Sequence, residues 1–242
     1  MTHTFQPVKR APLYMKVYQA IEADILSDRL PEHSALPTEA DLSAQLGVTR
    51  SSVREGIRLL EQSGLVERGP GKRLIVKRPQ TSEVAEAASK GMVRGGVTFR
   101  EVWQALSAMY PSASALAAEH LSEEAISELD QVVANLKDIP AKEHERVVEN
   151  AVEFFQMIAR GLDNRVLLTM LQSLNILIEA SLKQVIENTP KAKKRISVAQ
   201  RNILGAIKAK DRDLAAEWMS KHINDLKRGY DVAGIDLNQH VI

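Results

Sequence analysis

The chain has 242 residues and no cysteine, and its 32 lysines and arginines almost balance its 31 aspartates and glutamates. This length accommodates a small domain of about 75 residues and a second domain with its own core. Without cysteine there is neither a disulfide nor a thiolate metal site, and the small net charge excludes a global field that attracts nucleic acid. Any attraction to nucleic acid must therefore come from a local basic patch.

Two stretches of sequence bear on localisation. The first residues, MTHTFQPVKRAP, lack the continuous apolar stretch of a signal peptide. The longest apolar region, residues 167–182, is interrupted by polar side chains, so we expect a buried helix rather than a membrane span. Both observations predict a cytoplasmic protein that has no membrane partner.

Two short helices joined by a tight turn are predicted between residues 36 and 62. Thr38 is the expected N-cap of the first helix, with Asp41 as its capping-box partner. Gly47 stands where the chain leaves this helix in a left-handed conformation, and Thr49 caps the second helix. This order is typical of a helix-turn-helix.

The start of the second helix carries side chains suited to duplex DNA. A recognition helix presents its N-terminal turns to base edges in the major groove, where a guanidinium donates two parallel hydrogen bonds to one guanine. Short hydroxyl side chains beside a helix N-terminus favour a phosphate. The candidate DNA-binding residues of the two helices are Thr38, Thr49, Arg50, Ser51, Ser52 and Arg54.

A glycine-rich hairpin is predicted directly after the second helix. Residues 65–68 and 74–76 favour strands, and residues 69–73 favour a turn. This turn is interpreted as the wing of a winged helix-turn-helix, whose glycines let the backbone approach the sugar-phosphate edge. The candidate DNA-binding residues of the wing are Gly71, Lys72 and Arg73.

The local charge coincides with this motif. Residues 47–78 hold eight lysines or arginines against three glutamates, which is the electrostatic footprint expected of a nucleic-acid site. The alternative is that Arg54 and Arg58 only pair with acids on a solvated helix face, as most helical charges do.

Four short strings carry a family resemblance: LPTE at 36–39, GVTR at 47–50, VRE at 53–55 and GLV at 64–66. In this order and spacing, with a helix expected over 14–27, residues 13–77 resemble the N-terminal domain of the GntR family of bacterial transcription regulators. That family commonly has a DNA-contacting arginine directly after the glutamate of its LPSE signature, where this chain has Ala40. The resemblance therefore implies DNA binding with a shifted operator preference or a weaker affinity.

Beyond the wing, the sequence predicts a polar connector and then helices only. Ser82 is a candidate cap for a short helix that ends near residues 95–96. Six helical runs follow, each bounded by cap or breaker residues, at 98–120, 122–137, 141–161, 165–188, 193–209 and 211–228. The predicted fold class is mainly α, with an N-terminal winged helix-turn-helix followed by an antiparallel all-helical bundle. The expected domains are 1–78 for DNA binding, 79–96 as connector, 97–232 for effector binding and dimerisation, and 233–242 as tail.

A run of lysine and arginine at residues 191–195 is the second basic cluster of the sequence. It allows a second nucleic-acid site, but a solvated loop followed by a helix start is the preferred interpretation.

Loose motifs in the second half carry a further resemblance: LAA at 116–118, Phe154 ahead of Asn164, ILGAI at 203–207 and MSKH at 219–222. Their order resembles the all-helical (FCD-type) effector domain of the FadR-like branch of the same family, over residues 97–230. In many members of that branch, an aspartate and three histidines hold a divalent metal. The corresponding positions here are Ala151, Phe155, Gln200 and His222. A single imidazole does not supply the several donors of a tight site, so we predict no metal and no other cofactor.

The same register places Leu106 and Tyr110 where the family has an arginine and a glutamate. Such an interior favours an apolar or neutral ligand, because a buried carboxylate there would be uncompensated. The alternative is that side chains plug the pocket and that His222 is hydrogen-bonded to Gln200. The candidate ligand-binding residues are Leu106, Tyr110, Ala151, Phe155, Asn175, Gln200 and His222.

Catalytic motifs are missing from the sequence. The six histidines are scattered, and neither a Gly-x-Ser-x-Gly string nor a phosphate-binding glycine loop occurs. We expect no enzyme and no catalytic residue, but a cytoplasmic homodimeric repressor that binds an inverted-repeat operator in double-stranded DNA. A small-molecule effector in the helical domain would control it. The alternative is a dimeric DNA-binding regulator with a plugged pocket and no effector.

Overall fold

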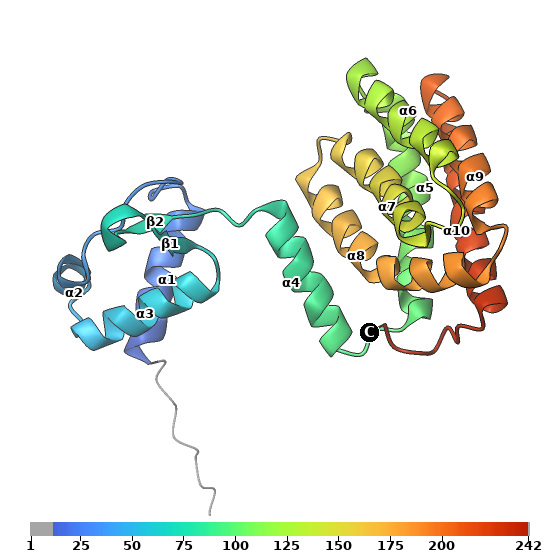
Figure 1. Cartoon of the computed structure of the whole chain (residues 1–242). Coiled ribbons are helices and arrows are strands. Elements are labelled where there is room, and N and C mark those ends of the chain that lie inside the picture. Colours follow the sequence, from blue (N-terminus) through green and yellow to red (C-terminus); the bar gives the residue numbers. More distant parts are fainter. Residues whose placement is uncertain (1–11, 242) are drawn as a thin grey trace, which may run out of the picture. The chain divides into compact units, whose positions relative to one another are not determined.

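The computed structural model describes residues 12–241, except for the side chains of Lys72 and Ala180. Residues 1–11, in which we expect no signal peptide, and residue 242 lie outside the described part. The described residues form two compact units, divided between Gln80 and Thr81 (Figure 1). No single described helix is long and apolar enough to cross a membrane; only the two parts of α8, bent by 45°, reach that length and composition together.

The first unit is a three-helix domain with a small hairpin. Its hydrophobic core brings together residues from all three helices and both strands, among them Val17, Leu42, Ile57 and Val76. The elements in chain order are α1 (Leu13–Leu26), α2 (Glu39–Leu46), α3 (Arg50–Gln62), β1 (Val66–Arg68), the 3₁₀ turn η1 (Pro70–Lys72) and β2 (Leu74–Val76).

Local capping explains where α2 and α3 begin and where α2 ends. The Thr38 hydroxyl accepts a hydrogen bond from the Asp41 amide at 3.2 Å, and the Thr38 amide donates to the Asp41 carboxylate at 3.3 Å, so the capping box is complete. Gly47 ends α2 at φ 63°, in the left-handed region that favours glycine. Thr49 caps α3 by accepting from the Ser52 amide at 3.3 Å. These three sequence predictions are confirmed.

A close approach between α1 and α3 supports the whole first unit. Gly56 lies on the buried face of α3, and a Cβ atom added there would lie 2.7 Å from Val17 Cγ1 and 3.0 Å from the Tyr14 carbonyl oxygen. Only a residue without a side chain therefore lets the two helices pack at this separation. No sequence pattern predicted the role of this glycine.

The wing is an antiparallel hairpin in which Val66 lies opposite Val76 and Arg68 opposite Leu74. A neighbouring segment extends it, because the Leu36 amide donates to the Leu74 carbonyl at 2.8 Å and the Val76 amide donates to the Ser34 carbonyl at 2.9 Å. The chain just before α2 is thus fastened to the wing, which the sequence analysis did not predict. The bonds place the start of the helix-turn-helix and the wing in one rigid arrangement.

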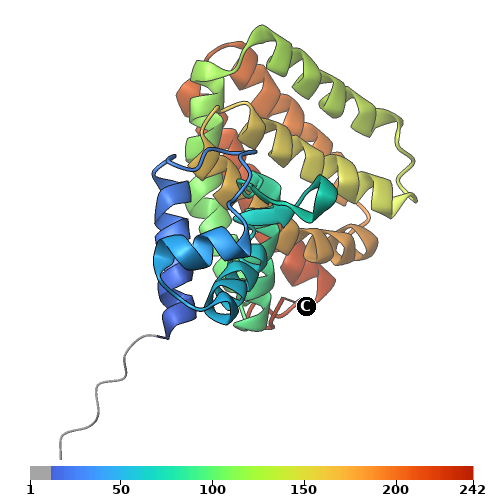
Figure 2. The same cartoon turned by 90° about the vertical axis from the view of Figure 1, so that its left-hand side faces the viewer.

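The second unit is all-helical and confirms the predicted fold class (Figure 1). Helices α6 and α7 lie side by side in both views (Figures 1 and 2). The helices in chain order are α4 (Thr81–Arg94), α5 (Phe99–His120), α6 (Glu123–Asp138), α7 (His144–Arg160), α8 (Arg165–Asn188), α9 (Ala192–Lys208) and α10 (Arg212–Ala233).

Two segments outside the expected bundle pack onto it. Most of the segment expected as a connector, residues 79–96, is α4, which lies on α8. There Ala85 and Ser89 are buried, and the Ser89 hydroxyl is 3.0 Å from the Ser173 carbonyl oxygen to which it donates. The last residues also pair with the chain near α5, since the Val241 amide donates to the Val97 carbonyl at 2.8 Å. Both segments therefore belong physically to the second unit.

Candidate DNA interface and effector pocket

The exposed face of α3 presents two arginines, Arg50 and Arg54. The Arg54 side chain is 70% exposed, and its Nε and Nη2 atoms lie 3.3 and 3.2 Å from the Glu39 Oε2 atom of α2. An exposed pair of this kind contributes about 0–1 kcal/mol to stability. Its main consequence is orientation, because a carboxylate on the neighbouring helix holds the guanidinium in place while most of it remains accessible.

Hydroxyl groups cluster at the N-terminus of α3. The Thr49 Oγ1 atom lies 2.9 Å from Ser51 Oγ and 3.0 Å from Ser52 Oγ. A helix N-terminus with free amides and hydroxyl donors suits a phosphate oxygen. Thr38 differs from these residues, because its hydroxyl both donates to the Asp41 carboxylate at 2.6 Å and accepts from the Asp41 amide. Its side chain therefore acts as a helix cap, and its DNA contact stays a prediction.

The tip of the wing is formed by η1, where Gly71 has φ 70° and Arg73 is exposed. The side chain of Lys72 lies outside the described part of the structure. Nearby charges are partly neutralised, since Arg68 pairs with Glu61 at 2.8 Å. The wing thus combines a flexible-backbone residue with an exposed guanidinium, as a contact to the sugar-phosphate edge requires.

The centre of the helical unit is filled by aromatic side chains. Tyr110 is fully buried, and its hydroxyl donates a hydrogen bond to the Asn175 side-chain oxygen. The Phe155 ring meets the Tyr110 ring edge-on at 4.6 Å between centroids and stacks on the His222 ring at 5.4 Å. Leu106, Tyr110 and Phe155 belong to the hydrophobic core of the helical unit. Aromatic packing therefore occupies the space where we expected a ligand.

Several buried polar atoms in this core lack partners. Gln200 is fully buried, and neither its Nε2 nor its Oε1 atom has a hydrogen-bond partner among the described residues; the same holds for His222 Nε2. The expected His222–Gln200 hydrogen bond of the plugged alternative is therefore wrong in its detail. Burial lowers the pKa of His222 to about 4, so the imidazole is neutral at pH 7. Buried unpartnered polar atoms cost about 1–3 kcal/mol each, which favours a polar ligand atom or water beside them.

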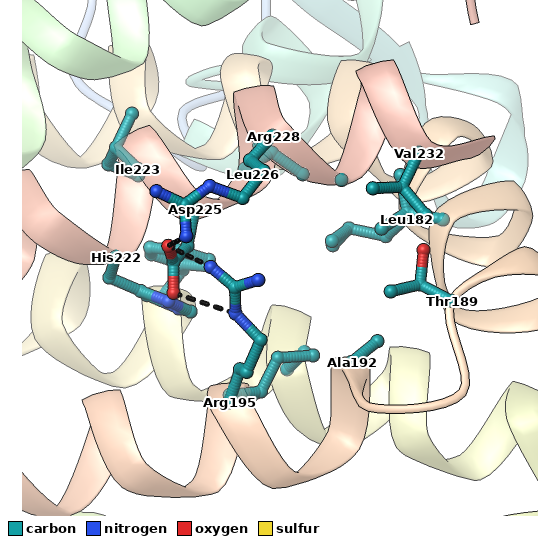
Figure 3. A pocket seen from close by; sticks show the side chains of 15 residues that line it. Leu182, Thr189, Ala192, Arg195, His222, Ile223, Asp225, Leu226, Arg228 and Val232 are labelled. Atoms are coloured by element: carbon teal, nitrogen blue, oxygen red, sulfur yellow. Dashed lines mark hydrogen bonds and ion pairs between the residues drawn. The ribbon is translucent and has the colours of Figure 1, made fainter. Parts of the chain in front are cut away.

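The interior cavity lies to one side of this aromatic centre, where the end of α8 and the start of α9 meet α10 (Figure 3). Its volume is about 50 Å³. Three predicted ligand-binding residues line it, namely Ala151, Phe155 and His222. The other four are not among its lining residues: Leu106, Tyr110, Asn175 and Gln200. The cavity is displaced because Tyr110 and Phe155 fill the bundle axis.

Charged residues that the sequence analysis did not assign to the site stand at this cavity. Arg195 of α9 pairs with Asp225 of α10, with Nε 3.1 Å from Oδ2, and Arg228 Nη1 lies 3.8 Å from Asp225 Oδ1 (Figure 3). Arg195 ends the basic run that we interpreted as solvated. Lys193 of the same run donates to the Lys137 carbonyl at 3.2 Å and to the Ile139 carbonyl, so it caps the end of α6. A local pattern does not predict pairs that join positions 30 residues apart.

The donor set does not fit the metal site of the FadR-like branch. Ala151 and Phe155 carry no ligand atom, and within residues 12–241 no group of three or more histidines, aspartates or glutamates is placed to hold a metal ion. These residues therefore do not form the metal site of that branch.

An accessible arginine-bearing helix, a wing and a helical unit with an interior cavity define a class of protein, the DNA-binding transcription regulator with a separate sensing domain. Residues 13–76 match the model for bacterial regulatory proteins of the gntR family, and residues 101–225 match the FCD domain. The chain belongs to the GntR family of transcription regulators and carries an FCD effector-binding domain. Proteins of this kind are not enzymes, as the sequence analysis predicted.

Similar proteins agree with this assignment. The HTH-type transcriptional repressor NanR of Salmonella typhi is 25% identical over 236 residues, which cover 95% of this chain and 88% of NanR. NanR of Salmonella typhimurium gives the same values. A solved GntR structure from Streptococcus agalactiae has a TM-score of 0.61 at 19% identity and covers 89% of this chain and 99% of its own. The structural likeness confirms the fold.

Proposed function

We propose that this protein is a cytoplasmic, homodimeric repressor that binds an inverted-repeat operator and releases it when a small effector occupies the FCD domain. The similarity to NanR, which is named a repressor, supports the direction of regulation. One helix-turn-helix contacts only a few base pairs, so two symmetry-related copies multiply the specificity. This reasoning favours a dimer on a two-fold symmetric site.

The observation that carries DNA binding is the exposed Arg54 guanidinium, held by Glu39 at 3.2 Å on the open face of α3. A guanidinium fixed in this way is ready to donate two hydrogen bonds to a guanine edge. The proposed DNA contacts are Thr38, Thr49, Arg50, Ser51, Ser52, Arg54, Gly71, Lys72 and Arg73.

The effector is proposed to place an apolar or neutral part inside the helical unit. The cavity is lined mostly by apolar side chains, and His222 and Gln200 offer neutral hydrogen-bonding atoms without partners. The proposed ligand-binding residues remain Leu106, Tyr110, Ala151, Phe155, Asn175, Gln200 and His222. A cavity of about 50 Å³ is smaller than typical ligand pockets of about 300–1,000 Å³, so binding requires the walls to move.

Helix α8 supplies a physical route from the cavity to the DNA-binding unit. Its second part lines the cavity through Leu182 and Val185, and its first part carries α4 through the Ser89–Ser173 hydrogen bond. Because α4 begins directly after the boundary between the two units, a displacement of α8 changes where the chain leaves the helical unit. An effector then shifts operator affinity by its differential affinity for the two arrangements.

A specific observation favours the second candidate, a dimeric DNA-binding regulator without an effector. The Tyr110 hydroxyl and the Asn175 side-chain oxygen are hydrogen-bonded to each other in the core, and the remaining cavity is small. In-vitro selection of duplex DNA by the full-length protein tests the sequence-specific DNA binding that both candidates share. The expected product is an inverted repeat bound by two chains. No preference among duplex sequences would overturn both candidates.

A metabolite panel then separates the two candidates. Thermal denaturation with each compound reports binding to the folded state, and release of the selected operator reports regulation. Stabilisation and release by one compound supports the sensor. Selective operator binding without a response to any compound supports the regulator without an effector.

A further inference from the structure

Two hollows in the helical unit share a wall. The interior cavity of about 50 Å³ and a surface groove of about 380 Å³ between α9 and α10 are both lined by Arg195, His222 and Asp225. The Arg195–Asp225 ion pair and the His222 ring therefore lie between the smaller cavity and the wider surface groove. Opening this pair would join the two hollows into one site with the volume of a metabolite.

The two sides of this wall differ in chemistry. On the cavity side, most of the lining is apolar and includes Leu182, Ala192, Ile196 and Leu226, and Arg228 is a further cationic residue there. On the groove side, four cationic residues stand against the single acid Asp225. They are Lys191, Lys194, Arg195 and Lys221.

The cationic residues of the groove differ in whether their charge is already paired. Lys221 pairs with Glu217 at 2.6 Å and lies 4.5 Å from the Trp218 ring centre, so its charge is already balanced. Lys191 and Lys194 are exposed, and no ion pair joins either of them to another residue in the described part of the chain. These two lysines can therefore take an external anion without breaking an ion pair, whereas Arg195 must first release Asp225.

An unpartnered nitrogen atom of His222, between the two hollows, also indicates a ligand. His222 is 8% exposed, and its Nε2 atom is buried without a hydrogen-bond partner among the described residues. A neutral imidazole can donate to or accept from a ligand atom that passes between the two hollows. Its stacking on Phe155 fixes the ring at this boundary.

We propose that the cavity and the groove form one binding site for an amphipathic anion, a compact apolar group joined to a sulfate, phosphate or carboxylate. The apolar group occupies the cavity, and the anionic group stays in the groove, where it replaces Asp225 as the partner of Arg195. An anion inside the apolar cavity is excluded by its desolvation cost, whereas an anion at the rim keeps water and gains charge-assisted hydrogen bonds. This inference rests on the proposed effector function. It requires only the part of the ligand that lies inside the cavity to be apolar or neutral.

The test uses the full-length protein and three probes that separate the two halves of the ligand. Hexyl sulfate, well below its micelle concentration, carries both halves, 1-hexanol only the apolar half and inorganic sulfate only the charge. In isothermal titration calorimetry, we expect one hexyl sulfate per chain, bound at least about tenfold more tightly than 1-hexanol, with no measurable sulfate binding. Higher salt should weaken the hexyl sulfate binding and leave that of 1-hexanol unchanged.

Three variants assign the binding to the two hollows. Lys194→Gln should weaken hexyl sulfate binding about fivefold without affecting 1-hexanol. Ala192→Leu fills the cavity and should weaken both organic probes. Lys142→Gln removes an exposed lysine outside the groove and should change neither. Thermal denaturation of each variant reports whether the fold is retained, and Lys194→Gln, which changes only an exposed side chain, keeps the test valid if Ala192→Leu does not fold.

Several results would overturn the proposal: no saturable hexyl sulfate binding, equal affinity for 1-hexanol, or equal weakening by Lys194→Gln and Lys142→Gln. Equal affinity for 1-hexanol would indicate a neutral ligand instead, and equal weakening would indicate unspecific charge attraction. Operator selection is measured separately, so a failure of this site is distinguishable from a failure of DNA recognition.

Discussion

Replacement of Arg54 by alanine tests the assignment of α3 as the recognition helix. The side chain is 70% exposed, and its exposed ion pair with Glu39 contributes at most about 1 kcal/mol to stability, so the variant should fold normally. Loss of a bidentate guanine contact costs about 1–3 kcal/mol, equivalent to about 5- to 150-fold in Kd for each half-site. Fluorescence anisotropy with the selected operator and its single-base variants, at constant salt, measures both affinity and base preference.

Two further variants define what the Arg54 result means. Arg146→Ala removes an arginine of α7 that is also exposed and paired, with Glu143 at 2.6 Å, and should leave operator affinity unchanged. Glu39→Gln keeps the guanidinium but removes its charged partner, so we expect a smaller loss of affinity with the same base preference. If Arg54→Ala binds the operator with wild-type affinity and wild-type discrimination at every base pair, the assignment of this arginine is wrong.

Three further predictions concern packing, protonation and metal content. Gly56→Ala should destabilise the protein in urea by about 1–3 kcal/mol, because the new Cβ atom meets Val17 at 2.7 Å, whereas Gly91→Ala, which meets nothing within 4 Å, should not; equal midpoints would refute the close approach. The pKa of His222 is about 4 in the folded state and about 6.5 when unfolded, so the unfolded chain binds the proton first and stability should fall between pH 6.5 and pH 4. The His222→Phe variant should lose this part of the pH dependence. If its free energy of unfolding changes between pH 6.5 and pH 4 as much as that of the wild type, the prediction is wrong. Protein purified without chelator or nickel should contain well below one divalent ion per chain by elemental analysis, and a stoichiometric ion would contradict the interpretation of the bundle interior.

Helix positions were predictable because helix ends are set by nearby residues. The cap at Thr38, the left-handed glycine at Gly47 and the cap at Thr49 each act within one turn of chain, and the structure shows all three. Across the second unit, the predicted runs correspond to the observed helices within a few residues, except that α10 continues to Ala233. The mainly helical fold class was confirmed for the same reason.

Relations between distant residues were not predictable from local patterns. The strand-like bonds of Ser34 and Leu36 to β2 join segments about 40 residues apart along the printed sequence. Gly56 has an ordinary place in a helical pattern, and only the position of α1 shows why a side chain does not fit there. Such contacts depend on how helices cross, which the spacing of apolar residues does not specify.

The ligand site, too, was predictable from the sequence only in part. The sequence by itself placed seven side chains in the bundle interior, six of them through its resemblance to the FCD-type domain, and all seven are buried. Only the tertiary structure decided which space those side chains leave open. Tyr110 and Phe155 pack against each other on the bundle axis, so the cavity forms where α8, α9 and α10 meet and is bounded by Arg195 and Asp225. A void is the difference between the volume that the backbone encloses and the volume that side chains fill, and that difference exists only once the helices are packed.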